Sequence, residues 1–275
     1  MTRTYTPWIL LAVALALAAV YLFPLYWMYV TSLKTGSEIF ANPPTFWPNN
    51  ANPGIYLEVW ARRAMPTYLW NSVLIASGVT AITVVLGTGC AYVLARYRNR
   101  WIDVGLFFIL MLQVLPASVM ITPLFVGFNQ VGLLNYPRTA VVLAAAAKAM
   151  PFFVVLVRAT FMSVPRELEE AALVDGNSRV GAFFFIVLPL ARNGILVCAI
   201  LTFMSAFGEY IYSRSIIQSP SLQPASVGLS GFLGPNSTDW NSIMAYSAIY
   251  VTPILVAFVI LQRRIVSGLT SGALK

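Results

Sequence analysis

Four carboxylates gather in one short segment of an otherwise apolar chain. Glu167, Glu169 and Glu170 lie within four positions, and Asp175 follows shortly after them. Burying a carboxylate in lipid without a partner is costly, so this segment is expected to lie outside any membrane. We interpret residues 163–189 as a loop that carries a short helix and is bound by another protein.

The side chains that most often carry catalysis or hold metals are scarce. The chain has no histidine, and its two cysteines, Cys90 and Cys198, both lie inside apolar runs. A Ser-His-Asp or Cys-His mechanism is therefore excluded, and the sequence predicts no soft-metal site. We read the two cysteines as small packing residues.

Two isolated charges lie within or beside apolar segments. Lys148 interrupts the run AVVLAAAAKAMPFF, and Glu209 lies toward the end of a later run. Charges at such positions often mark the path of a solute. The hypothesis is that one or both line a translocation path or pair across it. The alternative is that Lys148 packs against another subunit and that Glu209 only reaches the outer interface.

The composition requires a membrane protein with several spans. Of the 275 residues, 59% are hydrophobic and 9% are charged, and the mean hydropathy is +0.78. Soluble domains carry about 25% charged residues, and a span needs about 20 mostly apolar ones. The small residues of ALALAA also suit a signal peptide, but that apolar run is too long to be cleaved, which favours an uncleaved first span. The sequence predicts six spans, the third broken by Pro116 and Pro123, at about 8–30, 68–93, 102–125, 139–161, 194–212 and 243–261.

The distribution of basic residues predicts the orientation. Six spans place both termini on one side, and that side with its loops carries eleven of the seventeen Lys and Arg residues. The opposite side carries five, and Lys148 lies within a span. Because cytoplasmic loops are rich in Lys and Arg, both termini and the acidic segment are expected in the cytoplasm.

Local signals predict a short helix in the acidic segment. Pro165 suits the first turn of a helix, and acidic residues near the start complement its positive end. Gly176 suits the left-handed position that ends a helix, and Asn177 or Ser178 can cap the next one. An interfacial helix lying on lipid is the alternative, but such helices are usually basic, which favours a protein partner. One apolar stripe is expected, formed by Leu168, Ala171 and Ala172.

The spacing of this segment resembles the EAA loop of bacterial ABC importer permeases. Glu170-Ala171-Ala172 is followed after three residues by Gly176, and after nine more by Ile186-x-Leu188-Pro189. The preceding residues, VPRELE at 164–169, are similar to the usual lead-in of that loop.

Further motifs, spread over nearly the whole chain, resemble the carbohydrate branch of these permeases, and in particular the smaller permease subunit of maltose-type importers. Where that branch carries an Asn-Glu pair in the fifth span, this chain keeps Glu209 without the amide. The motifs are Ser32-Leu33-Lys34, Pro43-Pro44, Tyr68-Leu69-x-Asn71-Ser72, Ala91-Tyr92-x-Leu94-Ala95-Arg96, Gly132-Leu133-Leu134-Asn135, Pro151-Phe152 and a tail from Gly268 to Lys275.

The resemblance implies an all-α, polytopic protein with the fold of a type I ABC importer transmembrane domain and a coupling helix at about 164–176. The implied divisions are an N-terminal span and extracytoplasmic loop (1–67), the transmembrane domain (68–262) and a cytoplasmic tail (263–275). The residues implied to contact an ATPase are Glu170, Ala171, Ala172, Asp175, Gly176, Ile186, Leu188 and Pro189.

The implied function is that of a permease subunit of an ATP-driven importer in the bacterial inner membrane, forming half of the path for a sugar or polyol. The chain has no P-loop motif, so it is expected not to be an enzyme, and ATP and Mg²⁺ are expected in a separate ATPase. The implied partners are a second permease, a dimer of ATPase subunits and an extracytoplasmic solute-binding protein. No nucleic acid is implied.

Other classes of transporter stay open at this point. Permeases for amino acids, peptides, glycerol phosphate, phosphate or metals share the EAA loop. A secondary transporter driven by an ion gradient would need paired broken spans with buried carboxylates, and only Glu209 is near a span. An intramembrane enzyme would need paired catalytic groups, which a lone Lys148 does not supply.

Overall fold

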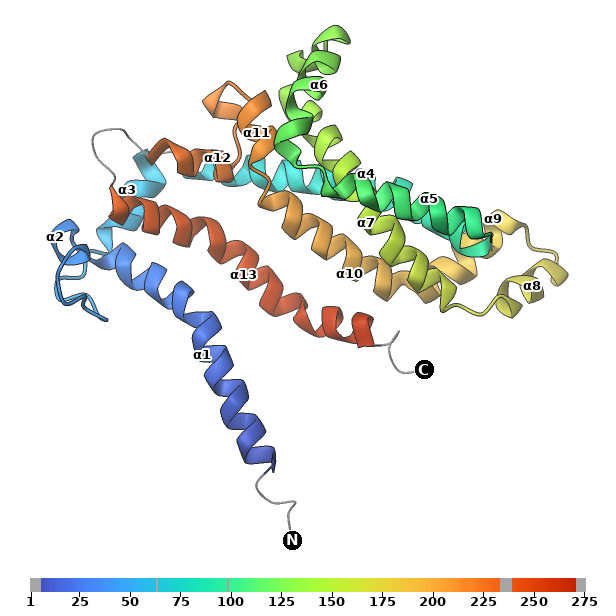
Figure 1. The fold of residues 1–275 in the computed structure, drawn as a ribbon, viewed down its shortest axis with the longest axis horizontal. Coiled ribbons are helices and arrows are strands. Elements are labelled where there is room, and N and C mark those ends of the chain that lie inside the picture. Colours follow the sequence, from blue (N-terminus) through green and yellow to red (C-terminus); the bar gives the residue numbers. More distant parts are fainter. Residues whose placement is uncertain (1–5, 63, 98, 233–238, 271–275) are drawn as a thin grey trace. The chain divides into compact units, whose positions relative to one another are not determined.

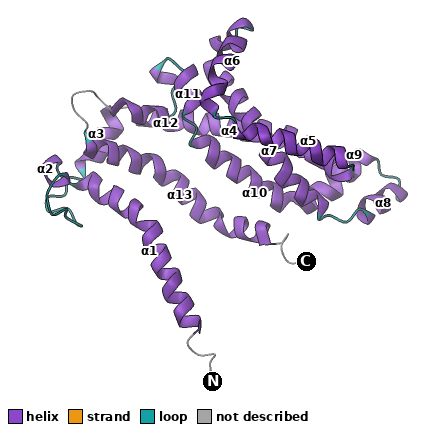
Figure 2. Cartoon of the chain, in the orientation of Figure 1, coloured by secondary structure: helices purple, strands orange, loops and turns teal. Residues whose placement is uncertain are grey.

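The computed structural model describes residues 6–62, 64–97, 99–232 and 239–270. These residues form helices joined by turns and loops, with no strand among them (Figures 1 and 2). The chain divides into two compact units, one of residues 1–66 and 228–253 and the other of residues 67–227 and 254–275. The all-α class implied by the resemblance is confirmed.

The first unit is built around a long N-terminal helix and the loop that follows it. Its elements are α1 (Thr6–Leu33), α2 (Gly36–Ile39), α3 (Gly54–Arg62), η5 (Ser230–Phe232) and the first part of α13 (Trp240–Thr270). The loop that follows α1 contains the short helices α2 and α3. The long apolar helix α1 includes the whole of the first predicted span.

A buried lysine at the end of α1 organises the loop of the first unit. Lys34 is only 2% exposed; its ammonium donates to Thr45 O and lies 4.4 Å from the centre of the Trp27 ring. The backbone carbonyl of Lys34 accepts a hydrogen bond from the Asn241 side chain, and Tyr56 hydrogen-bonds Ser32 over 2.6 Å. The motif Ser32-Leu33-Lys34 therefore holds this unit together.

The remaining helices lie wholly or mainly in the second unit, together with α13 from Ile254 onward. They are α4 (Met65–Arg96), α5 (Arg100–Met111), η1 (Leu112–Val114), α6 (Ala117–Gln130), η2 (Leu133–Asn135), α7 (Pro137–Met162), α8 (Glu167–Val174), α9 (Arg179–Ala182), η3 (Phe183–Val187), α10 (Leu188–Phe207), α11 (Ile211–Ile216), η4 (Pro220–Leu222) and α12 (Ala225–Leu229).

Five helices among the described residues are long and apolar enough to cross a membrane. They run over Trp8–Leu33, Met65–Arg96, Pro137–Met162, Arg179–Phe207 and Trp240–Gln262. The third predicted span is not one helix, because α5 ends at Met111 and α6 begins after Pro116. Proline disfavours helical backbone in the residue before it, so the predicted break at Pro116 is confirmed. Pro123, by contrast, lies inside α6.

The predicted fifth span needs a correction of its bounds. A continuous helical segment begins at Arg179 and ends at Phe207, so it starts and ends earlier than the predicted 194–212. Residues 183–187 form a wide π-helical turn directly before Pro189, which has no N–H to donate to the preceding turn. The helix therefore continues through Pro189, with a wider turn just before it.

Helices α7 and α10 pack along one another, as Figure 1 shows. A Cβ added at Gly194 of α10 would lie 2.5 Å from the Thr160 side chain of α7. Likewise, a Cβ at Gly87 of α4 would lie 2.6 Å from the Phe153 ring. Small residues let membrane helices approach closely, so these two glycines fix the spacing of α4, α7 and α10.

Some predictions fall outside the described residues. Residues 271–275 of the predicted cytoplasmic tail do so, as do Arg3, Arg63, Arg98 and Lys275 of the charges that were counted for the orientation. The part of the tail before residue 271 continues α13 as helix.

Candidate functional site

The acidic segment folds as the short helix α8, as its local signals predict. Its first turn carries Glu167, Glu169 and Glu170, where negative charge stabilises the positive end of a helix. The helix begins two residues later than expected, with Arg166 as its N-cap, so Pro165 precedes the cap and does not occupy the first turn. Of the predicted apolar stripe, Ala172 is buried and Leu168 and Ala171 are exposed.

A glycine turn ends α8. Gly176 has φ +86°, the left-handed conformation that side chains disfavour. Its N–H donates to Leu173 O over 3.1 Å, and the N–H of Asn177 donates to Ala172 O over 2.9 Å. This pair of bonds is the Schellman motif. The predicted role of Gly176 is confirmed.

The next helix is capped at once by a serine. Ser178 has extended backbone, and its Oγ accepts a hydrogen bond from Gly181 N over 3.0 Å at the start of α9. Of Asn177 and Ser178, the two residues predicted as possible caps, Ser178 caps α9. A tight turn therefore separates α8 from α9, and the turn residues 163–166 separate it from α7.

The outer face of α8 is exposed and partly apolar. Glu170, Ala171, Asp175 and Gly176 are all exposed, and Val174 is 88% exposed. Beside this face lies an open groove of about 440 Å³, lined by Leu168, Ala171, Ala172, Asp175, Gly176, Asn177 and Ile186. Of the predicted coupling residues, Glu170, Leu188 and Pro189 do not line it; Leu188 and Pro189 form the first turn of α10.

An ion pair that sequence reasoning missed joins α8 to α4. Glu169 accepts from Arg96 Nε over 2.5 Å and from the Tyr92 hydroxyl over 2.9 Å. The side chains of Glu169 and Arg96 are each only 14% exposed. The residues are far apart in sequence, so no local pattern shows the pairing; the only signal was that a basic cluster ends one span and an acidic cluster follows another.

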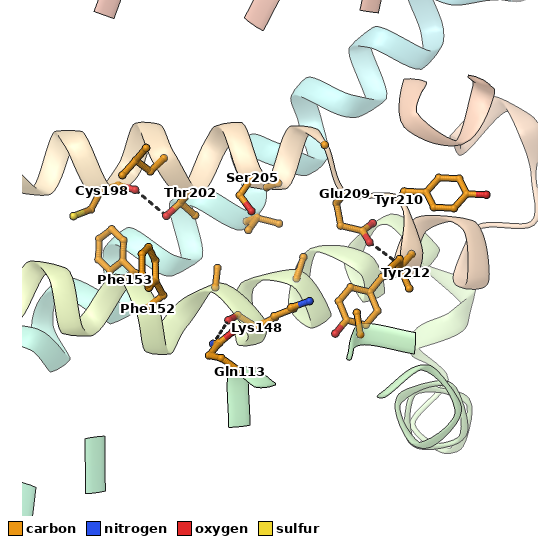
Figure 3. A pocket seen from close by; sticks show the side chains of 18 of the residues that line it. Gln113, Lys148, Phe152, Phe153, Cys198, Thr202, Ser205, Glu209, Tyr210 and Tyr212 are labelled. Carbon is orange, nitrogen blue, oxygen red and sulfur yellow. Dashed lines mark hydrogen bonds between the residues drawn. The ribbon is translucent and has the colours of Figure 1, made fainter. Parts of the chain in front are cut away.

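A second feature of this unit is a cavity of about 490 Å³ (Figure 3). Its walls come from α4, α6, α7, α10, α11 and the residues between α10 and α11, together with Gln113. The apolar part includes Phe152 and Phe153, while the polar groups are Gln113, Lys148, Thr202, Ser205, Glu209, Tyr210 and Tyr212. The cavity thus presents amide, hydroxyl and charged groups beside aromatic rings.

Lys148 and Glu209 line this same cavity from different elements. Lys148 projects from α7, and its backbone carbonyl accepts a hydrogen bond from Gln113 Nε2 over 2.6 Å (Figure 3). Glu209 follows the end of α10. Among the described residues no ion pair joins the two, so pairing across the cavity is not seen.

Glu209 is engaged in holding the start of α11. Its carboxylate accepts from Tyr212 N over 2.6 Å, Ser213 N over 2.9 Å and Ser213 Oγ over 2.6 Å. These N–H groups lie in the first turn of α11, where they have no partner within the helix. Burial, and to a smaller extent the charge of Glu209, raise the pKa of the Tyr212 phenol. Glu209 is therefore a helix cap as well as a cavity residue.

The predicted motif at the start of α4 holds the loop that follows α11. Asn71 is 2% exposed and donates to both Ser221 O and Gln223 O over 2.9 Å. Arg138, at the start of α7, donates to the Asn71 side-chain oxygen over 3.1 Å. The hydroxyl of Ser72 accepts from Ala225 N over 2.9 Å. The loop is thereby fixed to two long helices.

Comparisons with known proteins agree on one family. The family model described as "Binding-protein-dependent transport system inner membrane component" matches residues 83–271. The sulfoquinovosyl glycerol transport system permease protein SmoH of Agrobacterium fabrum is 33% identical, over 92% of this chain and 89% of that protein. The trehalose/maltose transport system permease protein MalG of Thermococcus litoralis is 30% identical, over 95% and 94%.

A solved structure shows the same fold. The crystal structure of a bacterial ABC transporter involved in the import of the acidic polysaccharide alginate contains a chain that superposes with a TM-score of 0.78. The match covers 96% of this chain and 98% of that chain, at 20% sequence identity. At that identity the match concerns the fold alone.

Proposed function

Because this chain belongs to the family of binding-protein-dependent transport system inner membrane components, the ABC importer permeases, we propose that it carries a sugar or a related polyol. In this proposal the chain forms one half of the translocation path. Helix α8 is the coupling helix through which a separate ATPase drives the transport cycle.

The observation that carries the coupling role is the geometry of α8. The helix is short, ends in the Gly176 turn just before the Ser178 cap of α9, and is joined by residues 163–166 to α7 and by α9 and η3 to α10. Its small, exposed Ala171 leaves room for a partner to approach closely. A protein bound to α8 would thus act on two spans at once.

The proposed contact with the ATPase includes the open groove beside α8. Of the motif residues, Ala171, Ala172, Asp175, Gly176 and Ile186 line this groove, and the exposed Glu170 precedes Ala171 on the same helix. Leu188 and Pro189 complete the motif by starting α10 just beyond the π-helical turn. An anionic helix that exposes apolar Val174 suits a protein cleft better than an anionic lipid surface.

The chemistry of the 490 Å³ cavity supports a sugar. Hydroxyl-rich solutes need several donors and acceptors together with aromatic faces. Thr202, Ser205, Gln113 and Tyr210 provide the polar groups, and the exposed Phe152 ring provides a face. Lys148 adds a positive charge. The names of SmoH and the Thermococcus MalG, which concern a glycoside and disaccharides, support the same assignment.

The remaining parts of the proposal concern assembly. The partners are a second permease, a dimer of ATPase subunits that bind ATP and Mg²⁺, and an extracytoplasmic solute-binding protein. Both termini and α8 lie on the cytoplasmic side of the inner membrane, following the excess of basic residues there. The proposal keeps the division into an N-terminal span with its extracytoplasmic loop (1–67), the transmembrane domain (68–262) and a cytoplasmic tail (263–275).

The test is uptake by the complete complex in proteoliposomes with its solute-binding protein. A panel of neutral, amino and acidic sugars, an amino acid, a peptide and glycerol phosphate is offered, with ATP inside or absent. We expect ATP-dependent uptake of at least one sugar and none of the other solutes. Uptake of a non-sugar alone would overturn the sugar assignment, and uptake driven by an ion gradient without ATP would overturn the ATP-driven mechanism.

A further inference from the structure

The covalent chain ties α8 to two spans but not to the third that lines the cavity. Residues 163–166 link α7 to α8, and residues 175–178 link α8 to α9 and the segment that continues into α10. Helix α4 contributes Val79 to the cavity wall, yet it ends at Arg96, about 70 residues before α8 in sequence. A displacement of α8 can reach α4 only through noncovalent contacts.

The strongest of these contacts is the pair Glu169–Arg96. Two guanidinium nitrogens of Arg96, Nε and Nη2, contact the same carboxylate oxygen of Glu169, and the Tyr92 hydroxyl donates to the other. Arg96 also donates from Nη1 to Phe161 O on α7 over 3.0 Å. Each hydrogen bond to a charged group is about twice as strong as a neutral one, and burial limits screening by water.

Arg166, the N-cap of α8, forms a second attachment. Its Nη2 donates to Arg96 O over 2.6 Å and to Ala95 O over 3.4 Å. These carbonyls belong to the last turn of α4 and have no partner within that helix. A basic side chain there also complements the negative end of the helix. The start and the first turn of α8 are therefore both bound to the end of α4.

The ring of Tyr92 adds packing to the same point. It lies edge-on to Phe161 of α7, with ring centres 5.6 Å apart, and 4.6 Å from Phe183 of the π-helical turn. The Arg96 guanidinium lies 5.7 Å from the Tyr92 ring centre. One residue of α4 thus contacts α7, α8 and the segment leading into α10.

We propose that Glu169 and Arg96, assisted by Tyr92, are positioning residues that make α4 move together with α8 during transport. This inference rests on the proposed function of α8. The inference goes beyond that function by naming the contact that carries the displacement of α8 to α4, which has no covalent link to α8 nearby. The motif Ala91-Tyr92-x-Leu94-Ala95-Arg96 acquires a mechanical role: its tyrosine and arginine bind the coupling helix.

The first test removes one charge of the pair at a time. In the reconstituted complex, Glu169→Gln and Arg96→Gln are expected to lower the sugar transported per ATP hydrolysed by at least about fivefold, because coupling between sites is typically worth 5–150-fold. The double exchange Glu169→Arg with Arg96→Glu restores part of the loss. Unchanged transport per ATP in both single variants would overturn the proposal.

A nearby ion pair provides a matched control. Arg158 contacts Asp103 over 2.8 Å, but Asp103 is 63% exposed and neither residue belongs to α8. Asp103→Asn is expected to leave transport per ATP within about twofold, since exposed pairs contribute little. A loss equal to that of Glu169→Gln would show that any charge lost near these helix ends has the same effect, and would overturn the proposal.

A distance measurement tests the attachment without reference to the solute. Spin labels are placed at Val93 of α4 and Glu167 of α8, both exposed, with the exposed Cys90 changed to serine. In the complete complex the distance is expected to stay the same with and without ATP, and to change with ATP once Glu169→Gln is added. A change with ATP in the unmodified pair would overturn the proposal. If uptake assays found no sugar while the distance stayed fixed, the substrate assignment would fail and this inference would stand.

Discussion

The turn at Gly176 allows the coupling role of α8 to be tested by backbone conformation alone. Its φ of +86° is unfavourable for any residue with a Cβ, but no atom within 4 Å would obstruct an added Cβ. Substitution therefore changes the turn without creating a steric clash.

The expected effects follow from the cost of that conformation. Gly176→Ala should destabilise the end of α8 by about 1–2 kcal/mol, the penalty of the left-handed region for an L-residue. Gly176→Asn should lose less, because asparagine visits this region more readily. Gly176→Pro cannot adopt a positive φ and also removes the N–H that donates to Leu173 O, so it should abolish the Schellman turn.

The assay is sugar uptake and ATP hydrolysis by the reconstituted complex. If docking requires the ordered turn, 1.4 kcal/mol corresponds to about a tenfold change in the docked fraction. Uptake per ATP should then fall in the order Gly, Asn, Ala, Pro, with the protein still inserted. Gly105→Ala in α5, where a Cβ also meets open space, is the control and should transport normally. Equal uptake by Gly176→Pro and the unmodified protein would refute the reasoning.

Three further predictions concern the cavity, the helix packing and the loop of the first unit. Lys148→Met should reduce uptake by about tenfold, with assembly intact, if the ammonium binds solute. Glu209→Gln should reduce uptake and also lower the melting temperature, because it weakens the cap of α11. Unchanged uptake in both variants would show that Lys148 and Glu209 are not part of the translocation path. Gly87→Ala should lower the stability by about 1–3 kcal/mol through overpacking, as measured by thermal unfolding in detergent. Gly89→Ala, where no atom lies close to an added Cβ, is the control and should leave the melting temperature unchanged. Equal melting temperatures for the two variants would contradict the packing account. The backbone hydrogen bond from Asn49 holds the pKa of Glu38 below its ordinary 4.5, so the ionised carboxylate stabilises the loop above pH 4.5 and this stabilisation is lost as the pH falls through the lowered pKa. Hydrogen-exchange protection of the loop should therefore fall in acid. Glu38→Gln should remove that pH dependence.

The local features of the chain could be predicted because they depend on neighbouring residues. The long apolar runs predicted α1, α4, α7 and α13 to within a few residues, except where α13 continues past residue 261. The turn at Gly176 and the cap at Ser178 were predicted because each needs only its own residue type and a few neighbours.

The features that were missed depend on contacts between distant segments. The Glu169–Arg96 pair joins residues 73 positions apart, and Asn71 holds a loop 150 positions away. Glu209 was expected at the end of a span, but the helix ends before it and its carboxylate turns to α11. Most of α11 and all of α12 lie between the fifth and sixth predicted spans, and they were not predicted because their few residues carry no clear periodicity.

The most direct test of the central claim is to ask what α8 touches in the membrane. A photoreactive amino acid at Val174, which is 88% exposed, is irradiated in the complete complex, with Val119 of α6, 61% exposed, as the control position. We predict that Val174 crosslinks to the ATPase subunit and that Val119 does not. Crosslinking of Val174 to lipid alone, with none to the ATPase, would contradict the assignment of α8 as the coupling helix.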